Sequence, residues 1–109
     1  MFARILEFTP KFEKQEELIK TVKLEILPIL NKQPGFLELL PFVPEIKNEK
    51  VITITLWNEK YEVEKYVREV FPKVEEILKP YLATPISYRM CKVETTLCEH
   101  FVRALSEVA

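Results

Sequence analysis

Three features of the sequence predict an α+β fold in a single domain. The chain has 109 residues, and halves of that length would be too small to bury separate cores. Segments of alternating apolar and polar residues indicate strands, and segments with an apolar residue at every third or fourth position indicate helices. Their order is strand, helix, strand, strand, helix, strand, and then one more helix. This is the split βαβ or ferredoxin-like arrangement, βαββαβ, in which two helices cover one face of an antiparallel four-stranded sheet. We expect residues 1–94 to form the core and residues 95–109 to form the additional C-terminal helix.

The run from Val51 to Trp57 is the strand around which we expect the rest to pack. β-branched residues fill most of it, and such residues favour strands. Successive side chains of a strand point to opposite faces, so this strand has one apolar face and one mixed face. The apolar face carries Ile52, Ile54 and Leu56, and the mixed face carries Val51, Thr53, Thr55 and Trp57.

The chain before this strand predicts a first strand and a long helix. Residues 2–9 form the strand, which Pro10 ends. From Glu13 to about Gln33 the apolar residues recur every four positions, which is typical of an amphipathic helix. Pro28 lies inside that helix. We expect a kink or an early end there, because proline lacks an N–H group and crowds the preceding turn.

A second strand is predicted between this helix and the central strand. Pro34 and Gly35 close the helix, with the only glycine of the chain at a position that favours a left-handed backbone. Residues 36–43 form the strand, and Pro41 within it favours an edge position or a bulge. Residues 45–50 make a polar connection.

The second half of the chain predicts a divided helix, a fourth strand and the terminal helix. Asn58 is the expected N-cap. Apolar residues keep helical spacing over residues 59–82, and Pro72 should divide this helix into two pieces. Residues 84–94 alternate as a strand. Residues 96–99 resemble a capping box, which predicts a short helix after it.

Charge and hydropathy argue against nucleic-acid and membrane partners. The net charge is −1, and both signs are interspersed along the chain, so no basic patch is available for phosphates or lipid headgroups. No apolar run approaches the ~20 residues that span a bilayer. The N-terminus lacks the pattern of a secretory signal. We therefore expect a cytoplasmic protein.

The central strand also argues against an RNA-recognition module, although such modules share this topology. They present aromatic residues beside glycine and basic residues for base stacking. The run from Val51 to Trp57 has neither glycine nor a basic residue, and its aromatic residue stands at the end.

Missing residue types exclude several kinds of site. With one glycine the chain cannot build a phosphate-binding loop, and without aspartate it cannot build a Ser-His-Asp triad. Cys91 and Cys98 are expected to be free thiols. Cys98 and His100 lie two positions apart, so on a helix they would point apart and could not share an ion. We expect neither a metal nor a cofactor.

Both faces of the predicted sheet carry large apolar side chains, yet two helices cover only one face. On the first strand Phe2, Leu6 and Phe8 alternate with Ala3 and Ile5. A second copy of the chain is the commonest cover for such a face, and we expect a homodimer. The alternative is that the C-terminal helix folds back over the sheet.

Three features of the chain together point to a known family. They are the strand order, the run Pro34-Gly35-Phe36 before the second strand, and Leu56-Trp57 followed by Asn58-Glu59-Lys60 and a long helix. In these features the chain resembles the antibiotic biosynthesis monooxygenase superfamily of dimeric α+β barrels. The resemblance implies a small homodimer in a superfamily that includes cofactor-independent oxygenases of polycyclic aromatic or quinol-type substrates, haem-degrading enzymes and proteins without an established reaction.

The haem-degrading branch of that superfamily does not match. It uses an Asn on the first strand, a Trp in the second helix and a His further along that helix as the iron ligand. This sequence has no Asn between Met1 and Pro10, no Trp after Trp57, and no His between Asn58 and Leu82.

The quinol-oxidising branch uses a Trp, an Asn, a Tyr and an Arg near its pocket. From these residue types we select as ligand-binding candidates Trp57, Asn58, Tyr61, Tyr66 and Arg89, and we assign no catalytic residue.

Each candidate also has a purely structural interpretation. Trp57 either walls a pocket with its indole N–H or anchors the core, and Tyr61 and Tyr66 either meet a substrate or pack with a wet hydroxyl. Arg89 either binds an anion or pairs with a glutamate across the dimer. Arg4 on the first strand has the same two interpretations.

Two functions therefore stay open. The first is a cofactor-independent monooxygenase acting on a small aromatic or quinol-type molecule. The second is a non-catalytic homodimeric module that binds a hydrophobic small molecule or serves assembly.

Overall fold

A computed structural model describes residues 1–47 and 49–98. Four antiparallel strands form one sheet in the order β2-β3-β1-β4. The elements are β1 (Phe2–Phe8), α1 (Gln15–Thr21), η1 (Val22–Ile26), α2 (Leu27–Asn31), β2 (Phe36–Phe42), β3 (Val51–Trp57), α3 (Lys60–Glu69), α4 (Phe71–Leu78), η2 (Lys79–Tyr81), β4 (Ser87–Lys92) and η3 (Thr95–Leu97).

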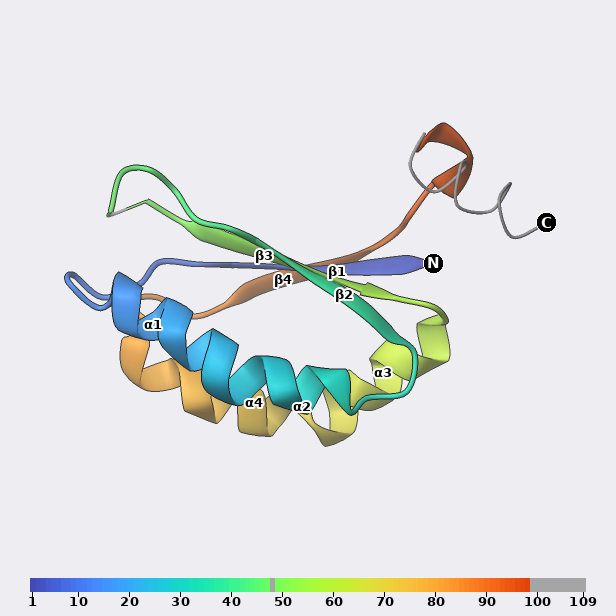
Figure 1. Ribbon diagram of the computed structural model, residues 1–109, viewed down its shortest axis with the longest axis horizontal. Helices are drawn as coiled ribbons and strands as arrows, with labels where there is room; N and C mark the ends of the chain where they lie inside the picture. Colours follow the sequence, from blue (N-terminus) through green and yellow to red (C-terminus); the bar gives the residue numbers. More distant parts are fainter. Residues whose placement is uncertain (48, 99–109) are drawn as a thin grey trace.

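The helices α1 to α4 all lie on one side of the sheet (Figure 1). The fold is therefore the predicted α+β, ferredoxin-like arrangement, with β3 and β1 in the centre and β2 and β4 at the edges. The core fills the space between the two layers. Its fully buried side chains are Trp57, Leu18, Leu30 and Val63.

The strand register assigns side chains to the two faces of the sheet. On β1, Arg4 pairs with Thr55 of β3 and Leu6 pairs with Thr53, and these four side chains are buried beneath the helices. The other face carries Ile5, which is opposite Ile54. The mixed face of the central strand thus points to the helices. No described α-helix lies over its apolar face, although Leu56 and its register partner Ala3 are buried at one end of that face.

The first helical run (α1, η1 and α2) contains a π-helical segment where the sequence pattern suggests only α-helix. At its end the Leu27 N–H donates to the Val22 carbonyl, five residues back. Pro28 follows directly, near the start of α2. The wider turn accommodates a residue that lacks an N–H, since π-type bonding re-routes the backbone there. The run therefore continues to Asn31 and does not end early.

The predicted division of the second helix at Pro72 is confirmed. Helix α3 ends at Glu69, and α4 starts at Phe71 with Pro72 in its first turn. The expected N-cap is wrong by one position: Glu59, with an extended backbone, occupies the N-cap position of α3, and its side chain makes no capping hydrogen bond. Pro41 lies on the edge strand β2, which also has a bulge between Phe36 and Glu38.

The fourth strand is shorter than predicted. β4 pairs with β1 only from Ser87 to Lys92. At its end Lys92 stands opposite Phe2, the first residue of β1, and at its start the pairing stops at Glu7 although β1 continues to Phe8. Within the described residues the segment after it is the 3₁₀ turn η3. The predicted C-terminal helix lies otherwise outside the described residues. None of the helices within residues 1–47 and 49–98 has the length and apolar character needed to cross a bilayer.

Candidate functional site

A row of polar side chains lies on the helix-facing side of the two central strands. Arg4 stands on β1, and Thr53 and Thr55 stand on β3. Tyr66 faces them from α3, where Val63 and Tyr66 form the buried side of the helix. All four polar side chains are buried. Polar groups in a dry interior must find partners there or in a ligand.

An aromatic cluster frames one end of this row. The Trp57 ring lies edge-on to Phe36, with centroids 5.5 Å apart, and is 4.9 Å from the ring of Tyr66. Tyr66 in turn lies 6.2 Å from Phe71. The Trp57 indole N–H donates to Thr55 Oγ1 over 2.9 Å. The cluster fixes Tyr66 and leaves the Thr55 hydroxyl proton free to be donated elsewhere.

Arg4 is a buried cation without a carboxylate partner among the described residues. Only 5% of it is exposed, and the ion pairs found in the described part of the chain do not include it. Its guanidinium carbon lies 3.9 Å from the centre of the Phe71 ring and 5.4 Å from that of Tyr88. Burial lowers the pKa of Arg4, and the nearby Tyr66, Tyr88 and Glu75 oppose this shift. The side chain nevertheless stays charged, because arginine does not lose its proton in proteins.

Tyr66 is held in its neutral form. Burial raises the pKa of Tyr66 to about 12, and the charge of Arg4 opposes the rise. At neutral pH its phenol is therefore a hydrogen-bond donor and not an ionised base.

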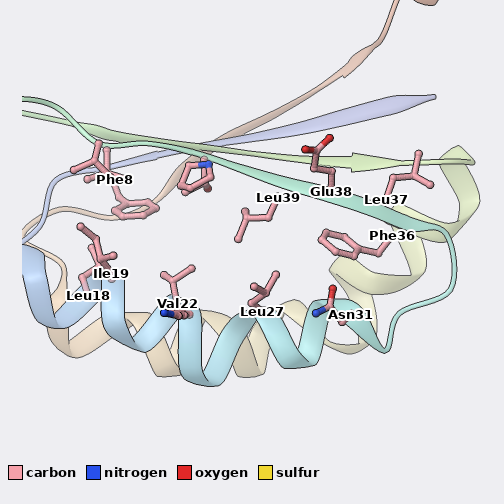
Figure 2. Close-up of a pocket in the computed structure, with 15 residues that line it drawn as sticks. Phe8, Leu18, Ile19, Val22, Leu27, Asn31, Phe36, Leu37, Glu38 and Leu39 are labelled. Atoms are coloured by element: carbon pink, nitrogen blue, oxygen red, sulfur yellow. The ribbon is translucent and has the colours of Figure 1, made fainter. Parts of the chain in front are cut away.

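A ligand-sized pocket lies between the first helical run and the strands (Figure 2). Its volume is about 330 Å³, within the range of small-molecule sites. Val22, Leu27 and Asn31 rise into it from the helical run, and Phe36 and Leu39 reach down from β2. These walls are mostly apolar, so they suit a flat hydrophobic body.

A separate, narrower cavity of about 30 Å³ borders this pocket and includes Arg4 in its lining. A space of that size holds one or two water-sized groups. The two spaces share walls, and the polar row lines the narrow one. The shared residues are Phe8, Val22, Leu39 and Thr53.

The structure separates the candidates selected from the sequence. Trp57 is fully buried, and its N–H is already bonded within the chain, so it anchors the junction between strand and helix. Asn58 is exposed, and its backbone N–H donates to the Gly35 carbonyl over 2.8 Å. Arg89 is exposed on the uncovered face of the sheet, opposite Ile5.

Tyr61 and Tyr66 both line a second hollow, between α3 and the residues Gln33 and Pro34 that follow α2. It measures about 300 Å³, and Glu62 and Lys65 bring charge to its walls. Of these two tyrosines only Tyr66 also lines the narrow cavity beside Arg4, which we call the interior cavity. The apolar pocket beside the first helical run is thus the better small-molecule site.

Sequence reasoning missed the residues that wall this pocket. Val22, Leu27 and Leu39 belong to segments that are adjacent only in the fold, and each fits an ordinary amphipathic pattern. A signal for Arg4 was available, since it falls on the same alternate positions as Leu6 and Phe8. That parity places its side chain on the same face of the strand as Leu6 and Phe8.

Within the described part of the chain, no group of three or more His, Cys, Asp or Glu side chains could hold a metal ion.

The fold and the pocket define a class of small α+β proteins, with a ferredoxin-like sheet and a ligand-sized space beneath its helices. Solved structures of the antibiotic biosynthesis monooxygenase family have this fold. No protein-family model matches the sequence, and no match is found among curated proteins.

Three solved structures illustrate the similarity. SnoaB from Streptomyces nogalater, a cofactor-independent oxygenase, has a TM-score of 0.72 and 15% identity over 90% of this chain and 97% of its own. The ActVA-Orf6 monooxygenase of Streptomyces coelicolor, solved with nanaomycin D, has a TM-score of 0.69 and 17% identity over 85% and 87%. A putative antibiotic biosynthesis monooxygenase from Nitrosomonas europaea has a TM-score of 0.71 and 8% identity over 85% and 89%.

Proposed function

We propose that this protein is a cofactor-independent monooxygenase that takes a small aromatic or quinol-type substrate into the pocket of Figure 2. The observation that carries the proposal is the apolar pocket of about 330 Å³ beneath the sheet, which shares walls with a smaller cavity lined by a row of hydrogen-bond donors. Its similarity to a cofactor-independent oxygenase and to a monooxygenase with a bound ligand supports the same reaction class.

The reaction would rely on the chemistry of the substrate. A tricyclic anthrone carries a CH₂ group between its rings, and its anion can pass electrons to O₂ directly. The carbon loses two hydrogens and gains one oxygen atom, and the second oxygen atom leaves as water. The reaction balances without an added reductant. The protein would position the ring and hold the oxyanion, which are contributions of proximity and of electrostatic stabilisation.

Oxygen uptake with an anthrone tests this function. Leu27→Trp should fill the pocket and lower uptake at least about tenfold, because it occupies the space that the substrate needs. Leu24→Trp is the matched control: Leu24 lies on the same helical run, is 59% exposed and does not line the pocket. The proposal would be contradicted by wild-type protein that consumes no oxygen above the uncatalysed rate, or by equal rates in the two variants.

Binding without turnover is the second candidate function. The observation in its favour is that the interior cavity has no histidine or carboxylate in its lining. An enzyme that must remove a proton would ordinarily place a base there. In the assay above, this function predicts saturable binding of the anthrone with no oxygen uptake.

We also propose that two copies of the chain pack their uncovered sheet faces together. That face is apolar at its centre, where Ile54 lies between Ile5 and Leu40 in the register. Phe42, on the edge strand, is 53% exposed. A second copy would remove this surface from water. Arg89 would then stand within the interface, where a partner glutamate could pair with it.

A further inference from the structure

The interior cavity has an unbalanced inventory of polar groups. Its polar lining consists of Arg4, Thr53, Thr55 and Tyr66, and the remaining walls are apolar. One of these groups is a fixed cation, and none is a carboxylate or an imidazole. The described lining therefore offers hydrogen-bond donors and positive charge, with no ionised acceptor to match them.

The groups around Arg4 leave its N–H bonds available. The guanidinium stands over the face of the Phe71 ring at 3.9 Å, and ring faces stabilise the charge without accepting strong hydrogen bonds. Thr55 already accepts the Trp57 N–H, so it has a proton to donate. Glu75 is near enough to act on the charge of Arg4 but forms no ion pair with it among the described residues. An anion in the cavity would therefore meet available N–H groups and gain charge-assisted hydrogen bonds.

The position of Arg4 excludes the partner subunit as the source of that anion in the proposed dimer. Arg4 lies on the helix-facing side of β1, paired in the register with Thr55, whereas a second copy would cover the opposite face. A group that reaches Arg4 must therefore enter between the sheet and the helices.

We infer that the ligand of this site is an organic anion with a flat apolar body, and that Arg4 is the residue that selects for its negative charge. The inference rests on the proposed function in one respect, namely that the pocket of Figure 2 is the ligand site. The body would occupy the larger pocket, and an oxyanion on its edge would extend past Thr53 into the narrow cavity.

The polar groups that line the interior cavity also limit the class of substrate. The described lining of the narrow cavity contains no base, and the carboxylate of Glu38 beside the larger pocket points away from that space (Figure 2). We therefore expect the ligand to arrive ionised or to be acidic enough to lose its proton on binding. Ring-conjugated hydroxyl groups and aryl carboxylic acids both satisfy this condition. Arg4 and the neutral donors would then stabilise the anion where its charge is delocalised.

Binding of matched aromatic probes tests the inference. The carboxylate probe is 2-naphthoate and its neutral analogue is 2-naphthamide. A third probe, 2-hydroxy-1,4-naphthoquinone, is an anion whose charge lies on a ring oxygen. Comparing it with 2-naphthoate shows whether the site prefers an ionised ring hydroxyl or a carboxylate. Titrated into the full-length protein, at least one anion should bind about tenfold or more tightly than the amide, the size expected for a charged hydrogen bond.

Two substitutions locate the preference. Arg4→Met should abolish the preference for the anion, whereas Arg89→Met should preserve it because Arg89 lies on the other face of the sheet. Arg4→Lys should keep part of the preference, since lysine retains the charge but not the planar fork. It also keeps the test informative if the methionine variant does not fold.

Several outcomes would overturn the inference. They are equal binding of anion and amide by the wild type, an undiminished preference in Arg4→Met, or loss of the preference in Arg89→Met. A preference that depends on Arg4 without any oxygen uptake would reject the oxygenase and keep the anion site. Oxygen uptake that depends on Leu27 without any charge preference would keep the oxygenase and reject the anion site.

Discussion

Tyr66 shows at the residue scale how the interior sets the chemistry of a side chain. It is 5% exposed, and its ring lies between those of Trp57 and Phe71. Burial raises its pKa to about 12 from 10.0 in spite of the nearby Arg4. The folded protein therefore favours the protonated phenol more strongly than the unfolded chain does.

This shift predicts an alkaline loss of stability that belongs to Tyr66. Because the pKa of Tyr66 is higher in the folded protein than in the unfolded chain, its contribution to the unfolding free energy is complete below about pH 10. That contribution is lost as the pH rises through about 12. By about pH 11 the wild type should have lost roughly 1 kcal/mol more unfolding free energy than Tyr66→Phe, which cannot ionise. Urea unfolding of both proteins between about pH 8 and pH 11 measures this. Parallel pH profiles would show that Tyr66 does not carry the effect.

The two arginines show what a sequence pattern reveals about a site. Arg89 and Arg4 both alternate with apolar residues on their strands, so the pattern predicts that each faces a sheet surface. It does not specify which surface the helices cover, since that depends on the handedness of the whole fold. The structure buries Arg4 and leaves Arg89 exposed. For Trp57 the pattern says less. Its position at the junction of strand and helix does not reveal that its indole N–H already donates to Thr55.

At the scale of elements, the sequence predicted the order of helices and strands well because their periods and prolines are local properties. Pro72 divided the second helix as expected. The π segment η1 was not predictable, since one extra residue per turn barely alters an apolar stripe. The length of β4 depends on which of its residues pair with β1, which is a non-local property. The pocket was missed for the same reason: its walls come from separate elements.

The turn before β2 gives a prediction at this scale. Gly35 has a φ of 81°, a left-handed conformation that disfavours residues with a Cβ. A methyl group there would also overlap the carboxylate of Glu62. Gly35→Ala should lower the unfolding free energy by about 1–2 kcal/mol, and Gly35→Asn should cost less because asparagine tolerates this conformation.

Urea unfolding with a second-site control separates the two causes. The Glu62 side chain is flexible, so backbone strain should dominate, and Gly35→Ala should remain destabilising in a Glu62→Ala background. Full recovery of stability in the double variant would mean that the clash and not the backbone is responsible.

At the scale of the whole molecule, the uncovered sheet face is the feature that a single chain leaves unexplained. Ile54→Lys places a charge at the centre of that face, between Ile5 and Leu40. A charge in a buried apolar interface is strongly unfavourable. We expect the wild type to have about twice the chain mass of 12.9 kDa and the variant to be monomeric.

Light scattering during size-exclusion chromatography measures both masses. Leu24→Lys, on the exposed side of the first helical run, should remain dimeric and controls for added charge. A wild-type mass of 12.9 kDa at every concentration would reject the dimer.

The central claim is that the space between the sheet and the first helical run holds the ligand. A crystal structure of the protein with 2-naphthoate tests it most directly. We expect density for the ring between Val22 and Leu39, with the carboxylate directed past Thr53 towards Arg4. Density in the hollow beside Tyr61, or an interior that stays packed while the probe binds elsewhere, would contradict it.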